Sequence, residues 1–260
     1  MSHRFADVAA VSFDGDGTLW DFESSMRTAL ALSAEALNEA GIRHRGVPIT
    51  PQWLQAIRDE VAAWPELQGA GMDVIRFVAF AEALQRAEPV RPELAAPLCE
   101  KYFDDRFAVL RPYPEVVEAI AALHARFPLA VVTNGNTHPA RLDLGAHFAQ
   151  VVLAIECGIH KPDPAIYTHA AELLGLDPGA CLHVGDHPHE DVDAARRAGM
   201  RTVWLNRDGD EWPADLAPAE LELRDLESLP GLLAVDRQVQ ARPIWQARPH
   251  PHPHPLRRED

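Results

Sequence analysis

Short apolar runs alternate with helical patterns over the second half of the chain. The runs are continuous rather than alternating, and they cover residues 8–13, 128–132, 151–155, 180–184 and 201–206. Continuous apolar runs are typical of parallel strands that are buried on both faces of a sheet. Helical spacing of apolar residues appears between them, at residues 114–127, 163–175 and 190–199. This alternation predicts a doubly wound, Rossmann-like α/β core with a parallel sheet, and residues 220–235 are expected to add a last short strand and helix.

The interval after the first strand breaks this alternation. It contains no convincing strand pattern, and its helical candidates are residues 22–40, 51–64, 72–87 and 92–107. Thr50 followed by Pro51 is a favourable start for a helix. We therefore expect an inserted all-helical cap domain. The predicted domains are an α/β core from residues 1–19 and 108–234, the cap from residues 20–107, and a mobile Pro-, His- and Arg-rich tail from residues 235–260.

The composition narrows the possible partners and location. The chain has 260 residues, of which 24 are basic and 39 acidic, for a net charge of -15. So much negative charge argues against binding to nucleic acid or to anionic lipid. No apolar run is long enough to span a bilayer, and no signal peptide is visible, which predicts a cytoplasmic protein. The three cysteines lack a C-x-x-C spacing, so we expect free thiols.

Chemically capable side chains follow three of the predicted strands, at the point where each strand ends. They are the stretch D-G-D-G-T at 14–18, T-N-G at 133–135, and G-D at 185–186 with Glu190 and Asp191 shortly after. The carboxyl ends of parallel strands line one edge of a sheet, and ligands bind there. We therefore expect Asp14, Thr133 and Asp186 to converge on one crevice.

Residues 14–18 allow two other interpretations, a calcium-binding loop and a plain turn. A calcium-binding EF-hand loop needs Gly at its sixth position and Glu at its twelfth. Counted from Asp14, these positions hold Leu19 and Ser25, so a calcium loop is excluded. A plain turn is the more frequent meaning of Asp and Gly in isolation. The polar residues that follow two other strands favour a functional site instead.

Lys161 and the aspartates suggest a chemistry. Only Lys101 and Lys161 among the 24 basic residues are lysine, and Lys161 lies in the proline-stiffened stretch G-I-H-K-P-D-P. Carboxylates gathered in one crevice repel one another, and an ammonium and a divalent cation would offset most of that charge. Oxygen ligands without cysteine or clustered histidine favour Mg2+. Such a site can receive a phosphoryl group, and the chain has no P-loop motif for a nucleoside triphosphate.

The ordered motifs D-x-D-G-T, T-N-G, K-P-D-P and G-D with a following Asp resemble those of the haloacid dehalogenase superfamily, whose members are mostly phosphatases. The resemblance covers residues 8–234, and the helical insertion resembles the helical cap of that superfamily. It implies that Asp14 is the nucleophile that forms an aspartyl-phosphate. Asp16 would protonate the leaving oxygen and then activate the water that hydrolyses the intermediate.

The same resemblance implies roles for the other residues. Thr133 and the backbone N–H of Asn134 would bind the phosphoryl oxygens, and Lys161 would neutralise charge. Asp14, Asp186 and the backbone carbonyl of Asp16 would hold Mg2+. Asp191 would orient Lys161 or the waters of the metal, and Glu190 is an alternative for that part, since spacing in this motif varies.

Asp16 also separates two reactions within the superfamily. The members that attack carbon resemble this chain but lack an acid at that position, because a halide leaving group needs no proton whereas an alcohol does. The sequence therefore predicts a Mg2+-dependent phosphatase that hydrolyses a small phosphorylated metabolite. The alternatives are a 2-haloacid dehalogenase-type hydrolase and a catalytically idle phosphate-binding module. At the entrance of the cap, Trp20 and Phe22 are candidates either for the pocket lining or for packing at the hinge. Arg27 is a weaker candidate for contact with a second anionic group.

Overall fold

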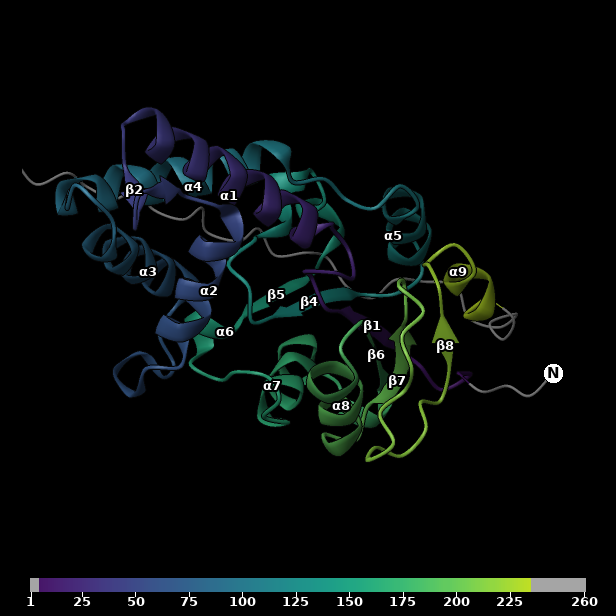
Figure 1. The fold of residues 1–260 in the computed structure, drawn as a ribbon. Helices are drawn as coiled ribbons and strands as arrows, with labels where there is room; N and C mark the ends of the chain where they lie inside the picture. The colour runs from purple at the N-terminus through teal and green to yellow at the C-terminus, as the bar shows by residue number, and fades with distance from the viewer. Residues whose placement is uncertain (1–4, 235–260) are drawn as a thin grey trace, which may run out of the picture.

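The computed structural model describes residues 5–234 (Figure 1). The predicted tail, residues 235–260, lies outside the described residues. Within the described part, a parallel sheet of six strands has the order β5-β4-β1-β6-β7-β8. The strands are β1 (Ala10–Phe13), β4 (Leu129–Thr133), β5 (Gln150–Leu153), β6 (Cys181–Gly185), β7 (Arg201–Leu205) and β8 (Glu222–Leu223). The predicted doubly wound α/β core is confirmed.

The register of the sheet decides which loops meet. Phe13 at the end of β1 is paired with Val131 of β4 on one side and with Val184 of β6 on the other. The loops that leave these three strands therefore start side by side at one edge. Every residue of β1 is buried, in keeping with its central place and its continuous apolar sequence.

Helices cover both faces of the sheet. Helices α5 (Val116–His124) and α9 (Leu229–Leu232) lie on one face, and α7 (Ala165–Leu174) and α8 (Ala194–Arg197) lie on the other (Figure 1). Gly175 ends α7 in the left-handed conformation that glycine adopts without strain, as its position after the apolar pattern predicted. The short helix α6 (Ala154–Cys157) follows β5 and leads toward the loop that carries Lys161.

The interval after β1 is folded into four long helices beside the sheet, at the left of Figure 1. They are α1 (Phe22–Glu39), α2 (Pro51–Ala62), α3 (Met72–Arg86) and α4 (Ala95–Val109). As predicted, the Thr50 hydroxyl caps α2 by accepting a hydrogen bond from the Trp53 N–H at 3.2 Å. The buried side chains of these helices form a hydrophobic cluster of their own, which supports the proposed division into a core and a cap. No helix within residues 5–234 has both the length and the hydrophobicity that crossing a membrane requires.

Two details differ from the sequence-based expectation. The interval holds a short antiparallel hairpin of β2 (Arg43–His44) and β3 (Val47–Pro48), where no strand was expected. Its two-residue turn has positive φ at Arg45 and Gly46, and strands this short leave no alternating pattern in the sequence. In the core, the helix expected at 190–199 is a π-helical turn (Pro188–Asp193) followed by α8.

Candidate active site

The loop after β1 presents two carboxyl groups at the edge of the sheet. Asp14 is buried and extends the sheet, because its N–H donates to the carbonyl of Val184 at 2.9 Å. Asp16 is partly buried, and its Oδ1 accepts a hydrogen bond from Nε1 of the fully buried Trp20 at 2.5 Å. Burial raises the pKa of Asp16, and the Trp20 hydrogen bond opposes that shift only in part. The environment thus favours a carboxyl that keeps its proton more readily than a solvated aspartate.

Lys161 is the charged centre of the arrangement. Its side chain is 2% exposed, and Nζ donates to Oδ1 of Asp14 and to Oδ1 of Asp191, each at 2.6 Å. Burial alone lowers the pKa of Lys161, but the two carboxylates outweigh it and hold the pKa above its usual value. The ammonium therefore stays charged in the folded protein.

Asp191, rather than Glu190, contacts this ammonium. Its second oxygen, Oδ2, accepts a hydrogen bond from the His187 N–H at 3.0 Å, and Lys161 holds the pKa of Asp191 well below its usual value against the effect of burial. Glu190 points elsewhere, since its Oε2 accepts from Nδ2 of Asn134 at 3.2 Å. Asp191 and Glu190 thus both belong to the site, but Asp191 contacts Lys161 and Glu190 contacts Asn134.

Asn134 and Thr133 come from the loop after β4. The Asn134 side chain clamps the backbone of Lys161, accepting from its N–H at 2.9 Å and donating to its carbonyl at 3.1 Å. The Thr133 hydroxyl accepts from the Gly135 N–H at 2.9 Å. A side chain at Gly135 would collide with the carboxylate of Asp16, so the loops after β1 and β4 are in close contact.

Asp186 closes the site from the loop after β6. Its Oδ1 accepts from the Thr18 hydroxyl at 3.0 Å, and burial together with the negative charge of Asp191 raises its pKa to about 6. Gly17, at φ 85°, approaches so closely that a Cβ there would meet the Asp186 carboxylate. The structure therefore places the residues predicted to converge at one edge of the sheet, through contacts with one another or between the loops that carry them: Asp14, Asp16, Thr133, Asn134, Lys161, Asp186 and Asp191.

The acidic residues can be tested for their fit to a cation. Oxygen atoms of Asp14, Asp186 and Asp191 lie within 4.8 Å of one another. Oδ2 of Asp14 is buried and receives no hydrogen bond, and burial raises the pKa of this carboxyl group, so a cation beside it would supply charge that the site otherwise lacks. Asp191 is already engaged through both of its oxygens. The donor set fits a hard divalent ion, with Asp14 and Asp186 as the carboxylates that have capacity to bind it.

The sequence analysis missed two residues that support the site. His183, in β6, is fully buried between the Ser12 hydroxyl, 2.9 Å from its Nδ1, and Oδ1 of Asp191, 3.6 Å from its Nε2. Tyr167, on α7, donates its hydroxyl hydrogen to the backbone carbonyl of Glu190 at 2.6 Å. A histidine inside an apolar strand and a tyrosine on the inner side of a helix were the available signals.

A cleft of about 630 Å³ opens between this edge of the sheet and the helices of the cap. Asp16, Asn134 and Lys161 line it from the core, and Phe22 lines it from α1, as predicted. Trp20 is instead part of the core beneath Asp16. Arg27 is exposed and ion-paired with Glu23, and it lines an adjoining pocket that Asp16 and Asp186 also line rather than this cleft. Its contact with a second anionic group stays a prediction.

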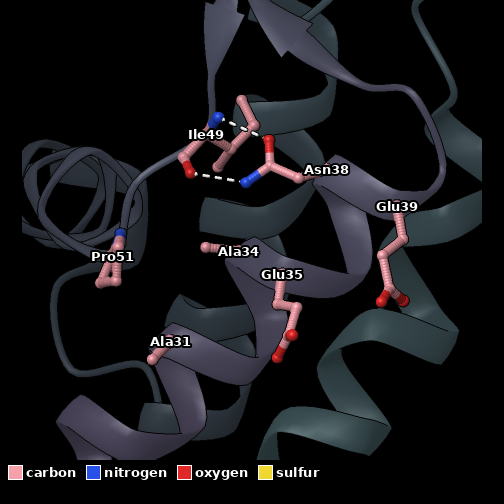
Figure 2. Close-up of a pocket in the computed structure, with 7 residues that line it drawn as sticks. All are labelled: Ala31, Ala34, Glu35, Asn38, Glu39, Ile49 and Pro51. Atoms are coloured by element: carbon pink, nitrogen blue, oxygen red, sulfur yellow. Dashed lines mark hydrogen bonds between the residues drawn. The ribbon is translucent and has the colours of Figure 1, made fainter.

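A second pocket lies within the cap and lacks such chemistry (Figure 2). It is lined by Ala31, Ala34, Glu35, Asn38, Glu39, Ile49 and Pro51. The Asn38 side chain bridges the backbone of Ile49 there, donating to the carbonyl at 2.9 Å and accepting from the N–H at 2.8 Å (Figure 2). This amide ties α1 to the start of α2, and the lining offers no cation to an anionic ligand.

The fold and the converging motifs define the family. Residues 8–199 match the sequence profile of the haloacid dehalogenase-like hydrolases, and the chain belongs to this family of hydrolases. The expectation drawn from the motifs is thereby confirmed.

The relatives include enzymes with both chemistries. The glyceraldehyde 3-phosphate phosphatase of Methanopyrus kandleri is 33% identical, over 77% of this chain and 84% of the relative. The phosphoserine phosphatase of Thermus thermophilus is 36% identical, over 63% of this chain and 70% of the relative. The crystal structure of a 2-haloacid dehalogenase from Pseudomonas syringae superposes with a TM-score of 0.72 at 33% identity, covering 87% of this chain and 98% of that one. Family membership alone therefore leaves the reaction to be argued from the site.

Proposed function

We propose that this protein is a Mg2+-dependent phosphatase that hydrolyses a small phosphorylated metabolite in the cytoplasm through an aspartyl-phosphate. The observation that carries the proposal is the second carboxyl group, Asp16, beside the nucleophile candidate Asp14. Asp16 lines the cleft, and burial raises its pKa even though the hydrogen bond from Trp20 opposes that shift in part. A carboxyl group that keeps its proton more readily than a solvated aspartate is suited to give that proton to a leaving oxygen.

The nature of the leaving group separates this reaction from dehalogenation. An alkoxide is a poor leaving group and must be protonated as the bond to phosphorus breaks, whereas a halide leaves without a proton. A dehalogenase therefore has no use for an acid at position 16. The dehalogenase relative shares the fold, but the raised pKa of Asp16 favours ester hydrolysis in this chain.

The proposed steps follow from the contacts of Asp14 and Lys161. Oδ1 of Asp14 is held by Lys161, and its buried Oδ2 has no hydrogen-bond donor. An Asp14 oxygen would bond to phosphorus while Asp16 gives its proton to the departing alcohol. The ammonium of Lys161, with the Thr133 hydroxyl and the Asn134 N–H, would bind the phosphoryl oxygens. Asp16, now a carboxylate, would take a proton from the water that cleaves the aspartyl-phosphate.

Asp14, Asp186 and the backbone carbonyl of Asp16 would hold the Mg2+ ion. Once bound, the ion screens the approach of one anion to another. Asp191 would keep Lys161 in place, because both of its oxygens are engaged by Lys161 and by the His187 N–H. Tyr167 and His183 would in turn fix Asp191, since both lie against it.

The test compares two leaving groups in the Asp16→Asn protein. The first substrate is p-nitrophenyl phosphate, whose p-nitrophenolate leaves without a proton. Asp16→Asn protein should still release about one equivalent of p-nitrophenolate in a rapid burst, and turnover should then stall at the aspartyl-phosphate. Glycerol 3-phosphate needs the proton, and its hydrolysis should fall by roughly 100-fold or more with no burst. Stopped-flow absorbance and phosphate release measure the two reactions.

Three controls complete the experiment. Asp14→Asn should abolish both the burst and turnover, whereas Asp104→Asn, an exposed aspartate on α4, should change neither. Wild-type activity should disappear with a chelator and return with Mg2+. Chloride release from 2-chloropropionate without phosphatase activity would contradict the proposal and support the dehalogenase. Phosphate binding with no turnover of either substrate would support an idle binding module.

A further inference from the structure

Two arginines of the cap are buried in the wall of the cleft opposite the carboxylates. Arg76 of α3 is 5% exposed and Arg106 of α4 is 2% exposed, and both line the cleft that Asp16 and Lys161 line from the core. Arginine is rarely buried to this extent without a partner, because transferring its charge from water is unfavourable. The partners of these two side chains therefore indicate their purpose.

Neither guanidinium has a carboxylate partner among the described residues. Arg76 forms no hydrogen bond or ion pair within residues 5–234, and its buried Nη1 has no partner. Arg106 donates from Nη2 to Oδ1 of Asn136 at 2.6 Å, and its buried Nε is likewise unpartnered. Asp73, which also lines the cleft, forms no ion pair with either arginine in this part of the chain. Asp16 attracts Arg106 across the cleft, but neither guanidinium is bonded directly to an anion within residues 5–234.

Aromatic rings hold both cations in place. The Arg76 Cζ lies 4.5 Å from the ring centre of Tyr102 and 5.9 Å from that of Phe80. The Arg106 Cζ lies 4.4 Å from the ring centre of Phe107. A ring face attracts the guanidinium but accepts none of its in-plane hydrogen bonds as a carboxylate would. The packing therefore orients each guanidinium group and leaves some of its N–H groups free to bind an oxyanion.

The cations also converge on one another. Arg58 of α2 lines the same wall. Burial lowers the pKa of Arg76 first, and the positive charges of Arg58 and Arg106 lower it further. Like charges gathered in a cleft are unfavourable on their own and become favourable when an anion lies among them.

We propose that Arg76, with Arg58 and Arg106 around it, binds a second anionic group of the substrate, so that the substrate is a phosphate monoester that also carries a carboxylate or a second phosphate. This inference rests on the proposed phosphatase function, because the phosphoryl group would occupy the opposite end of the cleft, at Asp14 and Lys161. Bidentate arginine contacts suit both kinds of oxyanion. The cap would then select substrates by charge, while the core performs the hydrolysis.

Matched substrate pairs test the inference in the wild-type protein. Phosphoglycolate is compared with 2-hydroxyethyl phosphate, and 3-phosphoglycerate with glycerol 3-phosphate, so that each pair differs by a carboxylate. Fructose 1,6-bisphosphate against fructose 6-phosphate asks whether the second anion is a phosphate. We expect kcat/KM to be roughly tenfold to a hundredfold higher for the doubly anionic member of at least one pair, mainly through KM. Equal values within all three pairs would overturn the inference.

Substitution of Arg76 assigns the preference to this wall. Arg76→Gln should reduce the ratio of kcat/KM within the preferred pair by about tenfold or more, and Arg76→Lys should restore part of it. Arg91→Gln is the matched control, because Arg91 is an exposed cap arginine that is paired with Glu93 and does not line the cleft. An unchanged ratio in a folded Arg76→Gln protein would contradict the assignment.

Binding separates this inference from the proposed function. Calorimetry on Asp14→Asn protein with Mg2+ measures affinity for each member of a pair without turnover. Tighter binding of the doubly anionic member that is lost in Asp14→Asn/Arg76→Gln protein supports the anion site even if the wild type hydrolyses nothing. Phosphatase activity with no difference in affinity within any pair leaves the proposed function standing and rejects the anion site.

Discussion

Two buried cations face each other across the cleft, and only one of them has carboxylate partners within residues 5–234. Lys161, on the core side, is bound by Asp14 and Asp191 at 2.6 Å each. Arg76, on the cap side, is buried to a similar degree and is surrounded by rings, with no carboxylate within ion-pair distance in the described part of the chain. The core thus supplies the counter-charges of its own cation, and the cap does not.

The two sides of the cleft therefore differ in whether the charge of the buried cation is balanced before a ligand binds. A compensated cation stabilises the folded state without ligand and keeps the chemical groups in a fixed arrangement. A buried cation without a counter-charge lowers the stability of the free protein, and its burial becomes favourable only when an anion binds beside it. Under the proposed function, the core side would perform the same hydrolysis on any phosphoryl group, whereas the cap side would respond to the charge of the rest of the substrate.

Removal of Lys161 is expected to have the largest effect on this comparison. In Lys161→Met, Asp14 and Asp191 lose their counter-charge while remaining buried, so the metal-free protein should lose about 3–5 kcal/mol of unfolding free energy. Under the proposed mechanism, activity should fall by roughly 100-fold or more, because the ammonium would no longer stabilise charge at the phosphoryl group. Urea denaturation and phosphate release measure the two losses.

The second lysine is the natural control for this experiment. Lys101 is half-exposed on α4, four residues before its ion-pair partner Asp105. Lys101→Met should change the unfolding free energy by less than about 0.5 kcal/mol, as for other solvated pairs at helical spacing. Equal effects of the two substitutions would show that the buried pairing on the core side does not stabilise the protein.

Arg76→Met is expected to have the opposite sign. Methionine fills much of the same space without a charge to bury, so the free protein should gain roughly 1 kcal/mol of unfolding free energy, after loss of the ring contacts. Arg207 provides the contrasting case, because it also lies over a ring, that of Tyr113, but is bonded to the carboxylate of Glu115 at 2.7 Å and to the carbonyls of Gly17 and Thr18. Arg207→Met should lose about 2 kcal/mol or more. A comparable loss in Arg76→Met would mean that Arg76 is structural.

The core side of this comparison was predictable from the sequence because it depends on local motifs. Continuous apolar runs indicated β1, β4 and β6, and the topology of a parallel sheet then brought Asp14, Thr133 and Asp186 to one edge. The fold restricts the order of the strands, and the register between neighbouring strands then sets which of these loop residues lie side by side. The prediction that Asp14 and Asp186 hold a metal stays a prediction.

The cap side was not predictable in the same way. Arg76 and Arg106 lie on helices that mix apolar and charged residues. From the sequence alone, a buried arginine on such a helix looks the same as one that reaches solvent, until the packing of α3 against α4 is known. The hairpin at β2 and β3 was missed because two-residue strands carry no periodic signal. His183 lay within a predicted strand, but its contact with Asp191 joins elements that only the tertiary structure places together.

His183 is a third kind of buried basic group in the comparison, one that is held neutral. Burial lowers the pKa of His183, so the imidazole is neutral beside Asp191. The unfolded chain, with a histidine pKa near 6.5, binds this proton more readily than the folded protein does. Stability from His183 is therefore present above about pH 6.5 and is lost as the pH falls toward the folded-state pKa, by at most about 1.4 kcal/mol per pH unit.

The measurement compares wild-type and His183→Gln proteins by urea denaturation without metal, between pH 7.5 and 5.5. Carboxylates with raised pKa values, such as Asp186, contribute the opposite slope, but they are present in both proteins and largely cancel in the difference. The wild type should lose more stability than His183→Gln on acidification, by up to about 1 kcal/mol over the range. Parallel curves would mean that His183 takes up a proton as easily when folded as when unfolded, and that Asp191 pairs with it as it does with Lys161.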